Sequence, residues 1–262
     1  LYDVNVEVLN IDEVEKTYPI INKKDILGGI FMPGDGQADP IGVTNLLAKA
    51  ARKEGVKIFE QCPVEKILKK NGRVAGVKVN GQTIECEYIV LATGMWSRQI
   101  GEDMGFSIPL YPAEHFYVIT EAINELPKNI PVLRDFNDSL YLKEDAGKML
   151  FGAFEPKAKP WGMDGISEEF CFDQLPEDID HFEPILEMGV NRLPFLGKVG
   201  IHTFFNGPES FTPDNRYYLG EAPELAGYWV AAGYNSIGIV SSGGAGMALA
   251  SWINDGYPPF DL

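Results

Sequence analysis

The sequence has 262 residues, of which 45% are hydrophobic and 11% aromatic, enough to bury a substantial core in one large or two modest domains. Its net charge of −16 argues against a duplex nucleic-acid partner, because phosphate binding needs a concentrated Lys and Arg surface. No apolar run approaches the roughly 20 residues of a membrane-spanning helix, and no signal-peptide pattern opens the chain.

The first residues predict a mixture of helix and strand. Residues 1–30 indicate a short strand or helix interrupted by turns. Asp39-Pro40 then begins a predicted helix that ends at Gly55, because proline suits the first turn of a helix and glycine stops it. Residues 56–59 are predicted to form a short strand.

A β-meander is predicted next. The runs 64–68, 73–79 and 82–86 are strand-like, and Asn71-Gly72 and Asn80-Gly81 join them. Asn-Gly is the preferred hairpin dipeptide because both central residues must take positive φ. We therefore expect three antiparallel strands joined by tight turns.

The middle of the chain, from about 108 to 200, has a different pattern. Residues 115–120, 140–143 and 149–154 are interpreted as alternating segments, which predicts an antiparallel sheet. An acidic helical stretch follows at about 176–190.

Two apolar strands outside this region end in small residues. Residues 88–92 and 228–232 are predicted to form buried strands, because they are continuous apolar runs of the kind found in parallel sheets. The first leads through Thr93 and Gly94 to a helix near Ser97, and the second leads to Gly233. Ligands of doubly wound sheets lie where such strand ends open into turns, although an ordinary glycine turn explains either junction alone.

The segment after Gly233 is the more specific of the two. Residues 234–239 link the strand to a helix predicted at about 239–254, which begins with small residues. Exposed amides at that helix start would favour a developing negative charge, and a tightly packed Gly/Ala helix without a ligand is the alternative. Residues 206–214 predict a constrained loop, because their prolines fix φ.

Two side chains on the predicted antiparallel sheet are candidates for chemistry. His115 lies on an alternating strand, where an imidazole facing a cleft would titrate near neutrality, and Tyr141 lies on another. A structural role explains either one alone. The sequence has no G-x-G-x-x-G after a first strand, no P-loop, no G-x-S-x-G and no H-E-x-x-H. The residues alone predict an α/β protein with a cofactor crevice and an antiparallel sheet on the substrate side.

Several strings resemble one family. NGPESFTPD (206–214), LGEAPELAG (219–227) and GYNSIGI (233–239) are similar to the D-amino-acid-oxidase-like flavoproteins, and most similar to the sarcosine and dimethylglycine dehydrogenases. Further matches, in family order along nearly the whole chain, are Gly34-Asp35-Gly36, Asp39-Pro40, Cys62-Pro63-Val64, 92–96, 114–117, 131–135 and 256–261.

The resemblance implies an α/β (α+β) fold in which a partial, Rossmann-like FAD-binding domain is interrupted by an antiparallel-sheet substrate domain. Residues 1–107 would form the first part of the FAD-binding domain, with some substrate-domain elements near the N-terminus. Residues 108–202 would form the substrate domain and 203–262 the last part of the FAD-binding domain.

The resemblance also implies the site residues. His115 and Tyr141 match the family positions that assist catalysis beside the flavin. The residues implied to bind FAD are Val64, Ala92, Thr93, Gly94, Trp96, Gly233, Tyr234, Asn235, Ser236, Ile237, Gly238 and Ile239. No metal site is implied.

The implied activity is FAD-dependent oxidative N-demethylation of a small N-methyl amino acid, sarcosine or dimethylglycine, by hydride transfer to flavin N5. His115 and Tyr141 would orient the amine and keep it unprotonated, because only a neutral nitrogen lone pair can drive hydride loss from its methyl group. Oxygen or an electron-transfer flavoprotein would accept the electrons, and tetrahydrofolate is a further cofactor implied for full-length members.

Some family features do not occur in this sequence. The dinucleotide fingerprint and the histidine that often holds FAD covalently would lie upstream of Leu1, and a folate-binding half would lie downstream. The sequence also starts without methionine, so we expect a fragment, inactive alone, that holds FAD weakly or not at all. Stoichiometric FAD, measured by absorbance after purification, would contradict this expectation.

Other functions are compatible with the resemblance. The family includes the catalytically silent regulatory subunit of pyruvate dehydrogenase phosphatase, and residues 114–117 and 180–184 are similar to that branch. Another amine, such as glycine, proline or a betaine-derived compound, is a second alternative. Arg134 is a candidate to bind a substrate carboxylate, and a structural or exposed role explains it equally well.

Cysteine usage bears on location. Cys62, Cys86 and Cys171 are isolated thiols without C-x-x-C spacing, which suits a reducing compartment and gives no zinc site. We therefore expect bacterial cytoplasm or a mitochondrial matrix, and nothing in the sequence chooses between them.

Overall fold

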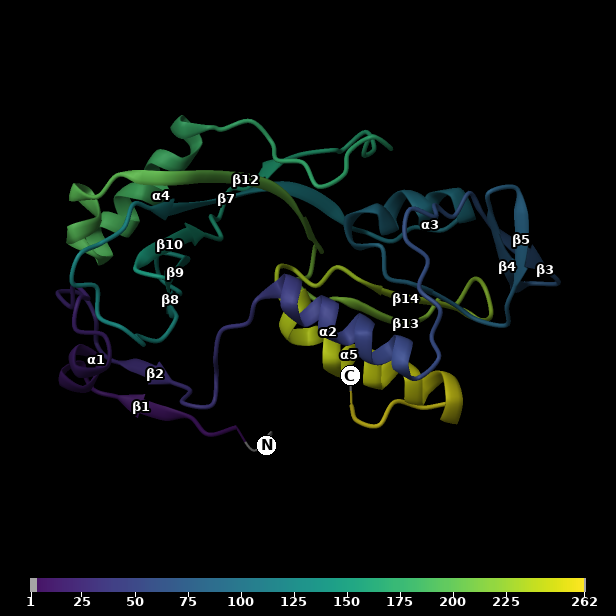
Figure 1. The fold of residues 1–262 in the computed structure, drawn as a ribbon, viewed down its shortest axis with the longest axis horizontal. Helices are drawn as coiled ribbons and strands as arrows, with labels where there is room; N and C mark the ends of the chain where they lie inside the picture. The colour runs from purple at the N-terminus through teal and green to yellow at the C-terminus, as the bar shows by residue number, and fades with distance from the viewer. Residues whose placement is uncertain (1–3, 262) are drawn as a thin grey trace. The chain divides into compact units, whose positions relative to one another are not determined.

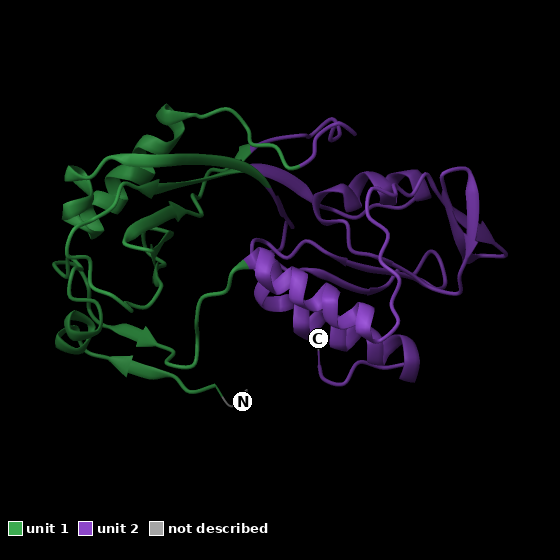
Figure 2. Cartoon of the chain, in the orientation of Figure 1, with its two compact units in different colours: residues 1–39, 114–159, 172–208 green, residues 40–113, 160–171, 209–262 purple. Residues whose placement is uncertain are grey.

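The computed structural model describes residues 4–261 as two compact units, shown in Figure 2. Unit 1 comprises Leu1–Asp39, Glu114–Lys159 and Phe172–Pro208. Unit 2 comprises Pro40–Ala113, Pro160–Cys171 and Glu209–Leu262. Each unit has a hydrophobic core of its own. No helix in the described part of the chain is long and apolar enough to cross a membrane.

Unit 1 is built on an antiparallel sheet packed against helix α4 (Ile179–Arg192), as Figure 1 shows. The strand order is β11-β7-β10-β9-β8, with β12 paired to β7. The strands are β7 (Tyr111–Thr120), β8 (Leu133–Asp135), β9 (Leu140–Asp145), β10 (Lys148–Ala153), β11 (Lys159–Pro160) and β12 (Ile201–Phe211). A 3-10 turn, η2 (Pro194–Lys198), follows α4.

Side-chain alternation gives this sheet two different faces. The buried residues of its strands, packed against Phe182 and Ile185 of α4, are Phe116, Val118, Leu140, Leu142, Met149 and Phe151. Each such side chain contributes about 1.5–3 kcal/mol when it is fully buried, so this face determines the strand register. Because successive side chains of a strand point to opposite faces, His115 and Tyr141 lie on the face opposite α4.

The amino-terminal segment contains β1 (Glu7–Leu9), α1 (Ile11–Thr17) and β2 (Gly29–Phe31), and β1 pairs antiparallel with β2. The sequence predicted a short strand or a helix in residues 1–30, and the structure has both. Arg192, which is 5% exposed at the end of α4, holds this segment. Its guanidinium donates to the carbonyl oxygen of Asn22 at 2.9 Å and to the carboxylate of Asp25 at 2.9 and 3.2 Å, and it pairs with Asp135 of β8 at 2.7 Å.

Unit 2 contains two three-stranded sheets. One is the predicted meander of β3 (Lys66–Lys70), β4 (Arg73–Val79) and β5 (Gln82–Glu85), and the other has the order β13-β14-β6. The remaining elements are β6 (Ile89–Leu91), β13 (Tyr218–Glu221), β14 (Tyr228–Ala232), α2 (Pro40–Lys53), η1 (Gly94–Trp96), α3 (Ser97–Met104) and α5 (Gly238–Asp255).

The local signals in unit 2 act as predicted. Asn71 and Gly72 have φ values of 53° and 74°, and the Asn80-Gly81 pair has 50° and 73°, as the hairpin turns require. Helix α2 ends just before Gly55, which has a φ of 90°. Strands β6 and β14 pair in parallel, as their continuous apolar sequences predicted.

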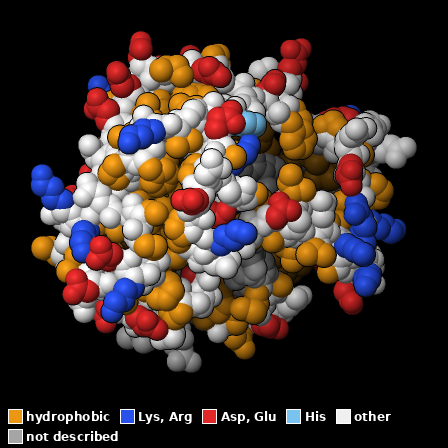
Figure 3. All heavy atoms as spheres, turned by 60° about the vertical axis from the view of Figure 1, so that its left-hand side comes forward, with side chains coloured by type: hydrophobic (Ala, Val, Ile, Leu, Met, Phe, Trp, Pro, Cys, Tyr) orange, Lys and Arg blue, Asp and Glu red, His pale blue; other side chains and the backbone are white. Residues whose placement is uncertain are grey.

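Three local predictions are wrong. Residues 56–59 form no strand, and Phe59 is 70% exposed without a neighbouring strand among the described residues. The loop predicted at 206–214 is mostly strand, because β12 continues to Phe211 beside β7 and only the end of the segment turns. Val90 is 44% exposed rather than buried, since β6 is the edge strand of its described sheet. Figure 3 shows other hydrophobic side chains exposed between dispersed charges.

Candidate functional site

His115 and Tyr141 lie side by side on the face of the unit 1 sheet opposite α4, which is called the open face below. Both residues are partly buried there. Nε2 of His115 and the hydroxyl oxygen of Tyr141 are 2.9 Å apart and share a hydrogen bond. Gly152 leaves room for this pair: it lies opposite Tyr141 in the sheet, and an added Cβ would lie 2.4 Å from the Tyr141 hydroxyl oxygen. The structure thus brings together the two residues that the sequence predicts as catalytic.

The surroundings of His115 favour its neutral form. Burial lowers the pKa of His115 below its usual value, the Glu155 carboxylate opposes this shift, and the charge of Arg134 adds to it. The ring of Phe154 covers the pair, with centroids 4.8 Å from His115 and 5.6 Å from Tyr141. Neutral imidazole has one unprotonated nitrogen. Nε2 therefore accepts a hydrogen bond from the Tyr141 hydroxyl in one tautomer and donates a hydrogen bond to it in the other.

Residues 152–155 were missed as site residues by the sequence analysis. Glu155 is fixed by His181 of α4, whose Nε2 lies 3.0 Å from the carboxylate. The sequence of β10, Lys-Met-Leu-Phe-Gly-Ala, is an apolar run after its first residue, and Gly152 in it was the only signal. Contacts made by Phe154 and Glu155 depend on tertiary structure and had no local pattern.

The turns after β6 and β14 leave the same edge of the unit 2 sheet, because these strands are parallel, with Val230 opposite Leu91. The first turn, Ala92 to Gly94, is exposed and continues through Trp96, which is partly buried. Val64 precedes the other sheet of unit 2, and its side chain is 55% exposed. The two junctions predicted to bind a cofactor are therefore neighbours, whereas Val64 lies in the segment before the other sheet of unit 2.

The turn after β14 has an unusual backbone. Gly233, Asn235 and Ser236 have φ values of 76°, 50° and 66°, and positive φ is uncommon outside glycine. The Asn235 side chain holds this conformation: its oxygen accepts from the Thr212 amide at 2.8 Å and its nitrogen donates to the Gly233 carbonyl at 2.9 Å. Ser236 donates to the Glu209 carboxylate at 2.9 Å.

Helix α5 begins directly after this turn without a side-chain cap. Its N-cap residue, Ile237, makes no capping hydrogen bond, so the positive end of the helix is open at Gly238 and Ile239. Tyr234, in the same turn, has a buried hydroxyl without a hydrogen-bond partner among the described residues. Its ring stacks on Tyr217 with centroids 5.0 Å apart.

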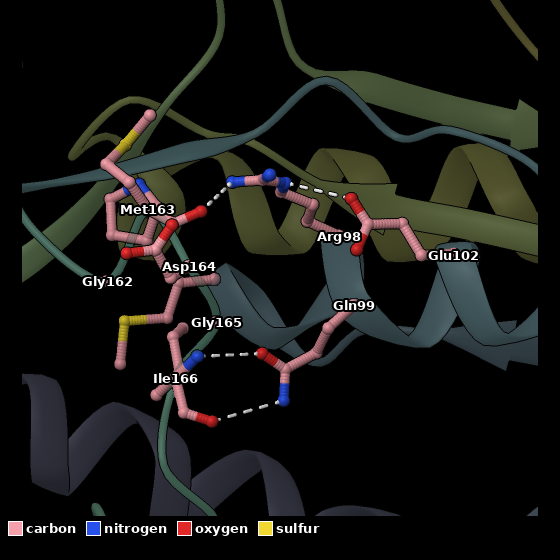
Figure 4. Close-up of a pocket in the computed structure, with 10 residues that line it drawn as sticks. Arg98, Gln99, Glu102, Gly162, Met163, Asp164, Gly165 and Ile166 are labelled. Carbon is pink, nitrogen blue, oxygen red and sulfur yellow. Dashed lines mark hydrogen bonds and ion pairs between the residues drawn. The ribbon is translucent and has the colours of Figure 1, made fainter.

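A cavity of about 220 Å³ lies beside α3 in unit 2, as Figure 4 shows. Gln99 forms two hydrogen bonds with the backbone of Ile166, and Arg98 donates to the Met163 carbonyl oxygen and the Glu102 carboxylate. These polar groups are paired with one another, and none of the predicted site residues lines the cavity. The cavity is therefore not the candidate site.

The comparison with known proteins identifies the family. The family profile described as "FAD dependent oxidoreductase" (DAO) matches residues 1–252. This chain belongs to the DAO family of FAD-dependent oxidoreductases. The predicted resemblance is thereby confirmed.

Curated DAO-family relatives match over nearly the whole chain. Mitochondrial sarcosine dehydrogenase of Homo sapiens is 37% identical over 100% of this chain, and mitochondrial dimethylglycine dehydrogenase of Mus musculus is 34% identical over 97%. The mitochondrial pyruvate dehydrogenase phosphatase regulatory subunit of Mus musculus is 37% identical over 96%. The chain spans only 29–30% of the length of these three relatives.

Solved structures confirm the fold class. L-proline dehydrogenase from P. horikoshii superposes with a TM-score of 0.85 at 24% identity, over 98% of this chain and 67% of that one. Glycine oxidase from Geobacillus kaustophilus gives 0.78 at 26% identity, over 99% and 66%. The mixed α/β fold with antiparallel sheets is thus that of DAO-family flavoenzymes.

The residues of the second turn fit the cofactor of this family. An uncapped helix start favours the negative charge that reduced flavin carries near N1. The unpartnered Tyr234 hydroxyl is a polar group that a bound ligand would satisfy. An added Cβ at Gly243, Gly244 or Gly246 would meet no neighbour within 4 Å, so none of the described elements packs against these positions of α5.

Proposed function

We propose that this chain takes part in FAD-dependent oxidative N-demethylation of a small N-methyl amino acid, with sarcosine and dimethylglycine as the candidate substrates. The His115–Tyr141 pair on the open sheet face carries the proposal. Similarity to a sarcosine dehydrogenase and a dimethylglycine dehydrogenase supports the substrate class.

Each residue of the pair has a distinct task in this proposal. Neutral His115, whose pKa burial lowers, accepts a hydrogen bond or a proton from the substrate amine and keeps the nitrogen lone pair available. Tyr141 fixes the imidazole orientation through the 2.9 Å hydrogen bond. FAD, when bound, supplies the acceptor for the hydride that leaves the N-methyl carbon.

We assign cofactor binding to the two neighbouring turns of unit 2. The turn backbone at 233–239 and the uncapped start of α5 would hold the ring system, supported by Asn235 and Ser236. The full set of proposed FAD-binding residues is Val64, Ala92, Thr93, Gly94, Trp96, Gly233, Tyr234, Asn235, Ser236, Ile237, Gly238 and Ile239.

Anaerobic mixing tests the proposal. The complete, FAD-loaded protein should lose its flavin absorbance with sarcosine or dimethylglycine, and formaldehyde should form in proportion. A panel of N-methylated amino acids, with glycine and proline included, then ranks the substrates by kcat/KM. If glycine or proline reduces the flavin and no N-methyl amine does, the proposed substrate class is wrong.

A regulatory role is the second candidate, because the phosphatase regulatory subunit is as similar as the sarcosine dehydrogenase. Absence of flavin bleaching with every amine in the panel would support that role.

The electron acceptor, oxygen or an electron-transfer flavoprotein, is identified by which of the two reoxidises the reduced protein. A role for tetrahydrofolate is tested by whether it captures the released one-carbon unit in place of formaldehyde.

A further inference from the structure

Arg134 places an unpaired positive charge on the face that carries the His115–Tyr141 pair. It lies directly opposite Tyr141 in the β8–β9 register, and its side chain is exposed. None of the ion pairs in the described part of the chain involves Arg134, although the sequence has 38 acidic residues. Arg192, by contrast, contacts three aspartates. Arg134 therefore keeps its donor groups available.

Aromatic side chains hold the Arg134 guanidinium in place. Its central carbon lies 4.4 Å from the ring centroid of Phe154 and 5.6 Å from that of Phe136. A guanidinium stacked on a ring leaves the N–H groups at its edge free to bind a planar acceptor. Phe154 also packs against both His115 and Tyr141, so one ring fixes all three polar side chains.

The charge and position of Arg134 favour binding of an anion. Partial burial between the two aromatic rings lowers the pKa of Arg134 from its usual value, and the charge interaction with Tyr141 opposes this shift. Because the side chain is exposed, its N–H groups are accessible to a carboxylate, which would form charge-assisted hydrogen bonds with them.

We propose that Arg134 binds the carboxylate of the amino-acid substrate while its amine meets His115 and Tyr141. This inference rests on the proposed function, because it assigns the two ends of that substrate to two neighbouring groups. It makes Arg134 the residue that distinguishes N-methyl amino acids from simple N-methyl amines. The planar fork of arginine matches a carboxylate with two parallel hydrogen bonds, which lysine cannot reproduce.

A non-reacting probe tests this without turnover. N,N,N-trimethylglycine has the carboxylate but no nitrogen lone pair, and tetramethylammonium lacks the carboxylate. Calorimetry on the FAD-loaded protein should show that Arg134→Gln weakens trimethylglycine binding about 10- to 100-fold, as loss of a charged hydrogen bond predicts. Tetramethylammonium binding should not change, and Arg134→Lys should recover part of the loss.

Arg73→Gln is the matched control, because Arg73 stacks on Tyr88 at 5.3 Å in unit 2. It should leave both affinities unchanged. Unchanged trimethylglycine binding in Arg134→Gln, with thermal melting showing a folded protein, would overturn the inference. If Arg134→Gln weakens the probe but no N-methyl amine reduces the flavin, the carboxylate site stands and the proposed reaction fails. If sarcosine reduces the flavin with the same KM in both proteins, only the Arg134 assignment fails.

Discussion

The open sheet face of unit 1 and the turn at 233–239 in unit 2 are built in opposite ways. On the sheet, regular backbone presents side chains, so the chemistry depends on which residues occupy positions such as His115 and Tyr141. In the turn, side chains such as Asn235 hold an irregular backbone, whose amides are the groups that we propose to bind FAD. Substitutions should therefore change the reaction at the first region and folding or FAD content at the second.

The largest expected effect is at His115. Replacing it by asparagine (His115→Asn) removes the group that we propose as general base, and such a base contributes about 10²- to 10⁴-fold to the rate. The rate of anaerobic flavin reduction should fall by that factor while FAD content stays constant. His202→Asn is the control, because His202 is exposed and, among the described residues, forms a hydrogen bond only with its neighbour Thr203. Equal rates in the two variants would remove His115 from the mechanism.

In the turn at 233–239, Gly233→Ala should lower the stability of the fold. An added Cβ would lie 2.6 Å from Cγ2 of Thr212 and 2.7 Å from Cδ2 of Leu110, at a φ of 76°. We expect a loss of about 1–3 kcal/mol in the free energy of unfolding from the overpacking, with loss of bound FAD, measured by urea titration and absorbance. Gly243→Ala, with no neighbour within 4 Å, should instead stabilise α5 by about 0.5–1 kcal/mol. Equal stability in both variants would contradict this contrast.

The smallest effect is the pH dependence of stability. Burial lowers the pKa of folded His115 below 6.5, so the unfolded chain binds a proton there that the folded chain does not. The His115 contribution is complete above about pH 6.5 and is lost as pH falls toward the folded pKa. Urea titrations between pH 7.5 and 5 should show a smaller decline in His115→Asn than in the wild type. Parallel declines would mean that folded His115 titrates as in the unfolded chain.

Local patterns were sufficient to predict most of the fold. The Asn-Gly pairs, Pro40 and Gly55 each act within a few residues, and they set the turns and helix ends that the structure shows. The segments 56–59 and 206–214 were wrong because a strand exists only where a partner lies beside it, which is a tertiary fact.

The candidate site was predictable only in part. Family resemblance pointed to His115 and Tyr141, and the structure joins them by a hydrogen bond. Phe154 and Glu155 reach them through packing and electrostatics across strands, and no periodicity marks such contacts. Assignment of the FAD-binding residues stays a prediction until cofactor binding is measured.

The Arg192 bonds to Asn22 and Asp25 have a consequence for the order of folding. They connect positions 170 and 167 residues apart, a separation that makes loop closure slow. The amino-terminal segment with β1, α1 and β2 can acquire these contacts only after α4 has formed. It should therefore pack against α4 late in folding and separate from it first in unfolding. Native-state hydrogen exchange should accordingly show earlier opening of the amides in α1 than of those in β9 and β10.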